Sequence, residues 1–198
     1  MIPDSHKAYL TFVWRAKEIT SAVIELARNN GVRALFDLDS VPLGKATEAL
    51  LIADGLSDCV DVKLNHADIE NGLARDFIIE TGLDRVWVEI QSFLPERYVD
   101  RVLGKISDLS QSCEIIPVVS DPGHIAKILH SNSSVKSIGL KGAEASGFVG
   151  SESAFNLFGI LKALIKDNGL NPKTYIWGTV SRPELAAAFL AEIGRAHV

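Results

Sequence analysis

Short apolar runs alternate with segments of helical periodicity along most of the chain. Each run has four to six residues and is rich in Val, Ile, Leu or aromatic residues, which is typical of buried strands. The runs predict seven strands, at 9–14, 33–38, 59–64, 85–90, 114–119, 137–141 and 174–178. Between them, apolar residues recur on one helix face, as at Ile19, Ala22, Val23 and Leu26. Further helices are predicted at about 44–54, 69–80, 95–110, 122–130 and 151–167.

Strands that alternate with helices predict an α/β fold with parallel strands and helical crossovers. Seven strand–helix units in a row fit a (β/α)8 TIM barrel that lacks about one unit, because such a barrel typically takes about 250 residues. A doubly wound open sheet is the alternative, but it usually has fewer strands and a break where the strand order reverses. The pattern shows no break, so we predict a single incomplete barrel over residues 1–192.

The last six residues, 193–198, read "IGRAHV" and interrupt a helical pattern in mid-course. They match the translation of a common sequencing adapter, so we interpret them as a non-native tail and leave them out of the fold prediction. On this interpretation the chain is a fragment, and the natural protein continues beyond it.

Charged residues occupy inward positions of two predicted strands. Asp61 and Lys63 are two residues apart and share one strand face, while Val60, Val62 and Leu64 form the other. On the next strand Trp87 and Glu89 share a face in the same way. If the apolar faces contact the outer helices, Lys63 and Glu89 meet inside the barrel near its catalytic end. We favour a structural ion pair and keep Glu89 as a candidate catalytic residue, because a buried charge must be matched.

The composition is that of a soluble globular domain, with 47% hydrophobic and 23% charged residues among 198. The net charge of −5 argues against a nucleic-acid partner. No apolar run approaches the roughly 20 residues that a membrane helix needs, and no secretory signal is visible. Cys59 and Cys113 show no CxxC spacing, which favours free thiols in a reducing, cytoplasmic setting. The histidines are scattered, so no metal site is predicted.

Two glycine-containing loops follow the sixth and seventh predicted strands. The first reads "KGAEASGFVG" from Lys141, and the second reads "WGTVSRPEL" from Trp177. Small residues before a helix let backbone N–H groups point at an anion, and phosphates often bind after the last strands of a barrel. The loops therefore indicate a phosphate-bearing ligand, although such loops also occur simply to turn the chain. Glu144 is expected to hold the first loop through backbone N–H groups. Asp37 ends its strand at a catalytic position, whereas Asp39 is interpreted as a helix cap.

The segment "LKGAEASGFVGSESAF" resembles the signature of the nitronate monooxygenase (2-nitropropane dioxygenase) family, and "YIWGTVSRPELAAAFLA" resembles the family's second loop. These proteins are FMN-binding (β/α)8 barrels. The stretches "ELARNNGVRALFDLDSVP" and "RVWVEIQS" further resemble the branch embedded in polyketide or lipid synthase polypeptides. The resemblance implies an FMN-dependent oxidoreductase domain of such a synthase.

The resemblance also implies roles for individual residues. Phe148 stands where the family has its catalytic histidine, and a phenylalanine cannot act as a base. The catalytic residues therefore stay unknown. Trp177 replaces a glycine of the second loop, which puts a bulky side chain where the family has none. The residues that the resemblance places against the flavin are Lys141, Gly142, Ser146, Gly147 and Gly178.

Three functions follow as expectations. The first is an FMN-dependent oxidoreductase with an altered catalytic base, acting on a small-molecule or carrier-bound acyl substrate beside other synthase domains. The second is a catalytically inactive scaffold or docking domain of that synthase. The third is a barrel that binds another phosphate-bearing ligand.

Overall fold

The computed structural model describes residues 9–13, 17–38, 41–51, 59–131, 135–145, 149–170 and 172–177. The strands within these ranges are β1 (Tyr9–Val13), β2 (Arg33–Asp37), β3 (Val60–Asn65), β4 (Arg85–Ile90), β5 (Glu114–Val119), β6 (Ser137–Lys141) and β7 (Lys173–Trp177). The helices are α1 (Lys17–Asn29), α2 (Leu43–Leu51), α3 (His66–Glu70), α4 (Leu73–Thr81), α5 (Glu96–Leu109), α6 (Pro122–Ser131) and α7 (Ala154–Asn168). None of these helices is long and apolar enough to cross a membrane.

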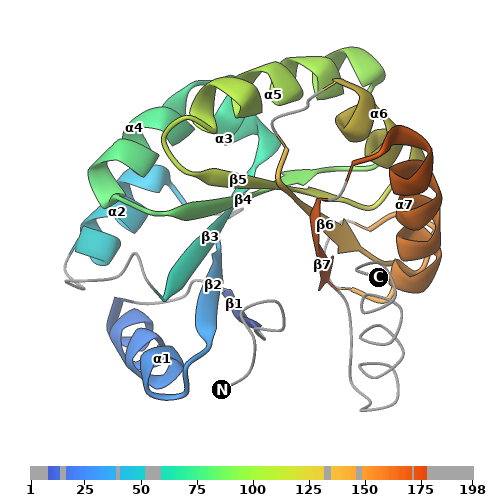
Figure 1. The fold of residues 1–198 in the computed structure, drawn as a ribbon. Helices are drawn as coiled ribbons and strands as arrows, with labels where there is room; N and C mark the ends of the chain where they lie inside the picture. Colours follow the sequence, from blue (N-terminus) through green and yellow to red (C-terminus); the bar gives the residue numbers. More distant parts are fainter. Residues whose placement is uncertain are drawn as a thin grey trace.

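The seven strands form one parallel sheet in the order β1-β2-β3-β4-β5-β6-β7, so every strand lies beside its neighbours in the sequence. The sheet is curled, and helices α2 to α7 follow one another around its outer side (Figure 1). A doubly wound sheet would require a reversal of strand order, which these strands do not show. The prediction of a parallel α/β fold of the (β/α)-barrel type is confirmed at this level.

Strands β3 to β6 are buried on both faces, but for different reasons. Val60, Val62 and Leu64 of β3 belong to the large apolar core, together with buried residues of the helices. The intervening residues face the interior of the curl, where Leu35, Trp87, Ile116 and Val118 form a second apolar cluster with Tyr175 and Trp177 packed against it. The interior-facing positions of the same strands also carry the charged side chains described below.

The helix predicted over 69–80 is wrong in its boundaries, because the structure has two helices there. The Asn65 side chain accepts a hydrogen bond from the backbone N–H of Asp68 and caps α3. Gly72 then adopts a φ of +78°, which lies in the left-handed region and separates α3 from α4. The apolar periodicity continues across this turn, so periodicity alone could not reveal it.

Candidate active site

Four charged side chains from four strands meet inside the curl at the carboxyl ends of the strands. We call Asp37 of β2, Lys63 of β3, Glu89 of β4 and Lys141 of β6 the carboxyl-end cluster. The Lys63 Nζ donates to Glu89 Oε2 at 2.5 Å, and the Lys141 Nζ donates to Glu89 Oε1 at 2.5 Å. Lys63 also lies 2.9 Å from Asp37 Oδ2. One carboxylate is thus shared by two ammonium groups.

The carboxyl-end cluster is almost completely withdrawn from water. The side chains of Lys63, Glu89 and Lys141 are 2%, 4% and 3% exposed, and that of Asp37 is 23% exposed. Two carboxylates and two ammonium groups balance in formal charge, which is the condition for burying so many ions together. The predicted ion pair between Lys63 and Glu89 is therefore confirmed. A catalytic role for Glu89 stays a prediction.

An aromatic side chain adjoins both lysines. The ring centroid of Trp177 lies 5.8 Å from the Nζ of Lys63 and 5.8 Å from the Nζ of Lys141, within the range of cation–π attraction. Trp87 contacts Trp177 edge-on at a centroid distance of 5.8 Å, and it contacts Tyr175 at 4.9 Å. The aromatic rings give the carboxyl-end cluster an apolar wall from β4 and β7.

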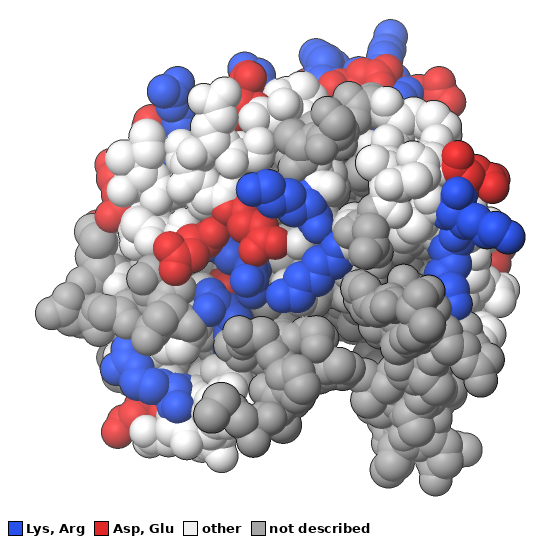
Figure 2. Space-filling model, in the orientation of Figure 1, with Lys and Arg blue, Asp and Glu red and all other residues white. Residues whose placement is uncertain are grey.

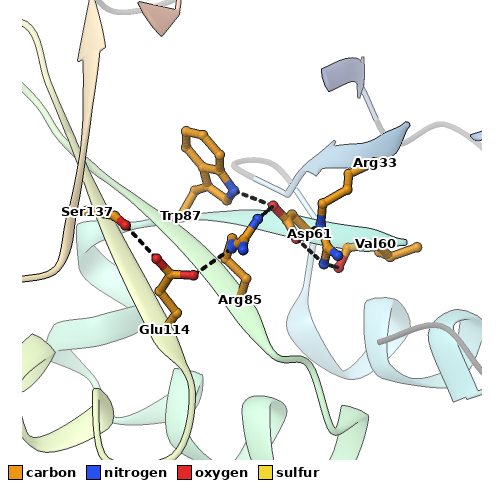
Figure 3. Close-up of polar contacts among 7 residues, drawn as sticks. All are labelled: Arg33, Val60, Asp61, Arg85, Trp87, Glu114 and Ser137. Atoms are coloured by element: carbon orange, nitrogen blue, oxygen red, sulfur yellow. Dashed lines mark hydrogen bonds and ion pairs between the residues drawn. The ribbon is translucent and has the colours of Figure 1, made fainter. Parts of the chain in front are cut away.

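A second charged cluster occupies the amino ends of the strands. We call Arg33, Asp61, Arg85, Glu114 and Ser137 the amino-end cluster. Asp61 lies between the two arginines, and the Trp87 indole points toward it (Figure 3). Asp61 Oδ1 accepts from Arg33 Nη2 at 2.6 Å, and Asp61 Oδ2 accepts from Trp87 Nε1 at 2.8 Å. Acidic and basic side chains also gather near the centre of the face seen in Figure 2. Position at the amino ends favours a stabilising role, since barrel chemistry occurs at the other end.

Glu114 has the clearest electrostatic perturbation in the amino-end cluster. Burial by itself raises the pKa of this carboxyl group, but the Ser137 hydrogen bond and the Arg85 guanidinium outweigh burial, and the net pKa lies below its usual value. Ser137 Oγ donates to Glu114 Oε1 at 2.5 Å, and Arg85 Nε donates to Glu114 Oε2 at 2.8 Å. Both partners favour the charged form.

This lowered pKa predicts an acid-dependent loss of stability. Because the folded-state pKa is below the unfolded one, the stabilisation from Glu114 is present above the usual value of 4.5 and disappears as the pH falls through the folded-state pKa. We expect the free energy of unfolding, measured by urea titration between about pH 6 and pH 3, to fall more for the unsubstituted protein than for Glu114→Gln. An equal fall in both proteins would show that Glu114 does not contribute to this pH dependence.

The loop that follows β6 is held by its own side chains. Both carboxylate oxygens of Glu144 accept from the backbone N–H of Ala154, the first residue of α7, at 3.0 and 3.3 Å. The Ser153 hydroxyl accepts from the N–H of Asn156. The prediction that Glu144 holds this loop is confirmed. The Glu144 carboxylate thereby accepts from an N–H group at the start of a helix, the kind of group that was expected to point at an anion.

Two glycines of this loop are required by close packing. A Cβ atom on Gly142 would overlap the backbone nitrogen of Ala154 and the carboxylate of Glu144. A Cβ atom on Gly150 would overlap the carbonyl oxygen of Ser120, at the end of β5. Both glycines let backbone lie against the protein itself, which accounts for them without a ligand.

The structure places the other predicted residues as follows. Lys141 points into the barrel toward Glu89 and is 3% exposed, whereas the resemblance implied a position against a flavin. Asp37 joins Lys63, as its strand-end position allowed. Among the described residues no group of three or more His, Cys, Asp or Glu side chains is arranged to hold a metal ion. Of the residues to which the sequence analysis gave a role, those that lie outside the described ranges are Asp39, Ser146, Gly147, Phe148, Gly178 and the proposed tail 193–198.

Two histidines lie near the carboxyl ends of the strands but do not belong to the carboxyl-end cluster. His66 begins α3, and its Nδ1 is buried without a hydrogen-bond partner among the described residues. His124 lies in α6, where burial lowers its pKa and favours the neutral ring.

The sequence did not identify Lys141 as a partner of Glu89. The signal was the alternation on β6, which puts Ser137, Gly139 and Lys141 on one face.

No family model and no curated protein sequence matches the chain. Solved structures do match. A mandelate racemase/muconate lactonizing protein from Herpetosiphon aurantiacus is 12% identical, with 94% of this chain and 49% of that chain covered and a TM-score of 0.61. A mandelate racemase/muconate lactonizing enzyme from Roseiflexus sp. is 13% identical, with 88% and 48% covered and a TM-score of 0.57. Dihydrodipicolinate synthase from Oceanobacillus iheyensis is 10% identical, with 90% and 70% covered and a TM-score of 0.53.

These matches show the fold, because the identities are too low to carry function. The chain spans about half the length of the racemase-type and lactonizing structures that it matches. The barrel-type architecture inferred from the strand order therefore has independent support from structures of several enzymes.

The assignment to the nitronate monooxygenase family is wrong. No family model supports it, and the matching structures include muconate cycloisomerase, dipeptide epimerase and mandelate racemase/muconate lactonizing proteins. The FMN-dependent oxidoreductase function falls with it, and nothing supports a polyketide or lipid synthase setting, whether active or as an inactive scaffold. The physical reason lies in the described part of the signature loop, where Gly142, Gly150 and Glu144 contact the protein itself and Lys141 turns toward Glu89. Binding of FMN itself stays a prediction, because Ser146, Gly147 and Gly178 lie outside the described residues.

Proposed function

We propose that the chain contributes to an enzyme that transfers a proton at a carbon atom next to a carboxylate or carbonyl group, as in racemisation, epimerisation or lactonisation. The observation that carries the proposal is the buried Glu89 shared by Lys63 and Lys141 at the carboxyl ends of the strands. Active sites of barrel enzymes lie at this end. The names of the matching structures agree with this class of reaction, including a dipeptide epimerase from Enterococcus faecalis.

The amine of Lys141 is the base in this proposal. Transfer of one proton from Lys141 to Glu89 turns a buried ion pair into a neutral amine and a neutral acid, which removes the cost of keeping two ions from water. Lys63 still faces the Asp37 carboxylate at 2.9 Å after this transfer, so its charge stays compensated. The neutral amine of Lys141 can then take a proton from carbon.

The same arrangement supplies electrostatic stabilisation. A substrate whose carbon loses a proton develops negative charge on its carbonyl or carboxylate oxygen, and the Lys63 ammonium group beside Lys141 would stabilise that charge in a site of low polarity. Lys63 contacts the side chains of both Asp37 and Glu89, which keeps it oriented before the reaction. We further propose that the curled sheet belongs to an eight-unit barrel, of which seven strands are described here.

Hydrogen exchange at carbon tests the proposal directly. The full chain is incubated in D2O with 2-hydroxy, 2-amino and 2-aryl carboxylic acids, and loss of the α-proton signal is followed by NMR. We expect Lys141→Met to slow the exchange of the responsive acid by roughly 100-fold or more, which is typical when a general base is removed. Lys105→Met, on the exposed face of α5, is the matched control and should leave the rate unchanged. Exchange that survives Lys141→Met, or its absence with every acid in the folded protein, would contradict the proposal.

A further inference from the structure

We propose that the Lys141 amine also forms a covalent imine with small 2-oxo acids. This activity goes beyond proton transfer, because it makes a carbon–nitrogen bond, and either activity can hold without the other. The amine stands at the carboxyl end of β6, is 3% exposed, and lies 2.5 Å from a carboxylate that can accept its proton. A lysine withdrawn from water beside a second cationic group is a recognised arrangement for this chemistry.

The contacts distinguish Lys141 from Lys63 as the nucleophile. Lys63 forms ion pairs with two carboxylates, at 2.9 Å to Asp37 and 2.5 Å to Glu89. Within the described ranges, the ion pairs of Lys141 involve Glu89 alone. Loss of a proton from Lys141 therefore leaves one ammonium group, on Lys63, beside the Asp37 carboxylate and a protonated Glu89. Loss of a proton from Lys63 would instead remove the positive charge from two ion pairs, those with Asp37 and with Glu89.

The bond-forming step balances with Glu89 as the proton carrier. Glu89 takes one proton from the Lys141 ammonium group, and the neutral amine attacks the carbonyl carbon of the 2-oxo acid to form a C–N bond. Glu89 returns its proton to the resulting hydroxyl group, and the C–O bond breaks. The carbonyl oxygen departs as water with two of the three ammonium protons. A positively charged iminium group remains on Lys141, so the formal charge is the same before and after.

The surroundings favour a 2-oxo acid over a simple aldehyde. The Lys63 ammonium group offers a counter-charge for the substrate carboxylate, since both lysines contact the same Glu89. The Trp177 ring, at 5.8 Å from both Nζ atoms, offers a flat wall along a planar 2-oxo acid or its iminium product. The Asp37 side chain is the most exposed member of the cluster, at 23%.

Reductive trapping with glyoxylate tests this inference. The full chain is incubated with glyoxylate and sodium cyanoborohydride, the adducts are counted by intact-protein mass spectrometry, and their positions are mapped by peptide mass spectrometry. We expect one adduct to form faster than all others, at Lys141. Lys141→Arg keeps a positive charge opposite Glu89 but cannot form an imine, so this adduct should be lost, whereas Lys105→Arg should keep it.

The mapping on the unsubstituted chain decides the question even if Lys141→Arg folds poorly. A leading adduct at Lys63, or labelling of Lys141 no faster than of exposed lysines such as Lys105, would overturn the inference. The two proposals can fail separately. The exchange experiment uses acids that have no ketone or aldehyde group, whereas the trapping experiment requires such a group. Trapping without exchange would support the imine alone, and exchange without trapping at Lys141 would overturn the imine alone.

Discussion

Replacement of Glu89 by glutamine is expected to lower the free energy of unfolding by about 3–5 kcal/mol, the usual cost of leaving a buried charge without its partner. Glu89 compensates Lys63 and Lys141 together, and both ammonium groups are at least 97% withdrawn from water. With glutamine at this position, Lys63 still faces the Asp37 carboxylate, but Lys141 loses the one carboxylate with which it forms an ion pair in the described ranges. Urea denaturation followed by circular dichroism measures the change.

A second substitution separates charge balance from shape. In the double variant Glu89→Gln/Lys141→Met, the remaining Lys63 and Asp37 balance each other, so we expect the protein to recover a large part of the stability that Glu89→Gln loses. Glu80→Gln, on the exposed surface of α4, is the matched control and should change stability by less than about 0.5 kcal/mol. If the double variant loses, relative to the unsubstituted protein, the sum of the losses measured for Glu89→Gln and Lys141→Met separately, then Lys141 and Glu89 are not coupled energetically.

Replacement of Asp61 by asparagine is expected to destabilise the protein by about 3–5 kcal/mol as well, but at the amino-end cluster. The Asp61 side chain is completely buried and accepts from Arg33 Nη2 at 2.6 Å and from the Trp87 indole at 2.8 Å. It also lies 3.8 Å from Arg85 Nη1, so asparagine leaves two guanidinium groups without this counter-charge. The same urea titration measures the loss.

Two comparisons make the Asp61 result specific. Asp108→Asn, at an exposed position of α5, should leave stability within about 0.5 kcal/mol of the unsubstituted value. In Asp61→Asn, reductive trapping at Lys141 should persist at a denaturant concentration where the protein stays folded, because the amino-end cluster is separate from the lysines. If Asp61→Asn is as stable as Asp108→Asn, the contacts of the Asp61 carboxylate with Arg33, Arg85 and Trp87 do not contribute to the free energy of unfolding.

Strand alternation predicted much of the interior. The apolar set Val60, Val62 and Leu64 fixed the direction of the outer face, so Lys63 had to face inward, and the same reasoning applied to Glu89. These are local consequences of a period of two, which tertiary structure cannot change without moving a whole strand between its faces. The sequential order of strands followed from the regular alternation of strands and helices.

The function of the glycine-rich loop could not be predicted in this way. A glycine is needed equally where backbone approaches a ligand and where backbone approaches another part of the chain. Gly142 lies against Ala154, twelve positions later, and Gly150 lies against Ser120, thirty positions earlier. These approaches depend on how β5, β6 and α7 meet in space. The motif therefore looked like a cofactor loop, and the contacts that explain it became visible only in three dimensions.

The sharing of Glu89 was hidden for a related reason. Lys141 reaches Glu89 from two strands away, because β5 lies between β4 and β6 in the sheet. The curl of the sheet brings these strand ends within reach of each other across the interior (Figure 1). A comparison of adjacent strands alone predicts the contact between Lys63 and Glu89 but not the contact between Lys141 and Glu89.

The sequential strand order also governs how stability is distributed. Each strand from β2 to β6 has hydrogen-bonded neighbours on both sides, and in the described residues β1 and β7 each pair with one. Such an array is coupled mainly between nearest neighbours, much like the units of a repeat protein. Strand β4 stands at its centre and carries Arg85, Trp87 and Glu89, which reach both charged clusters and the aromatic wall. A defect in β4 would therefore divide the array into two short halves, each too small to bury its own interior.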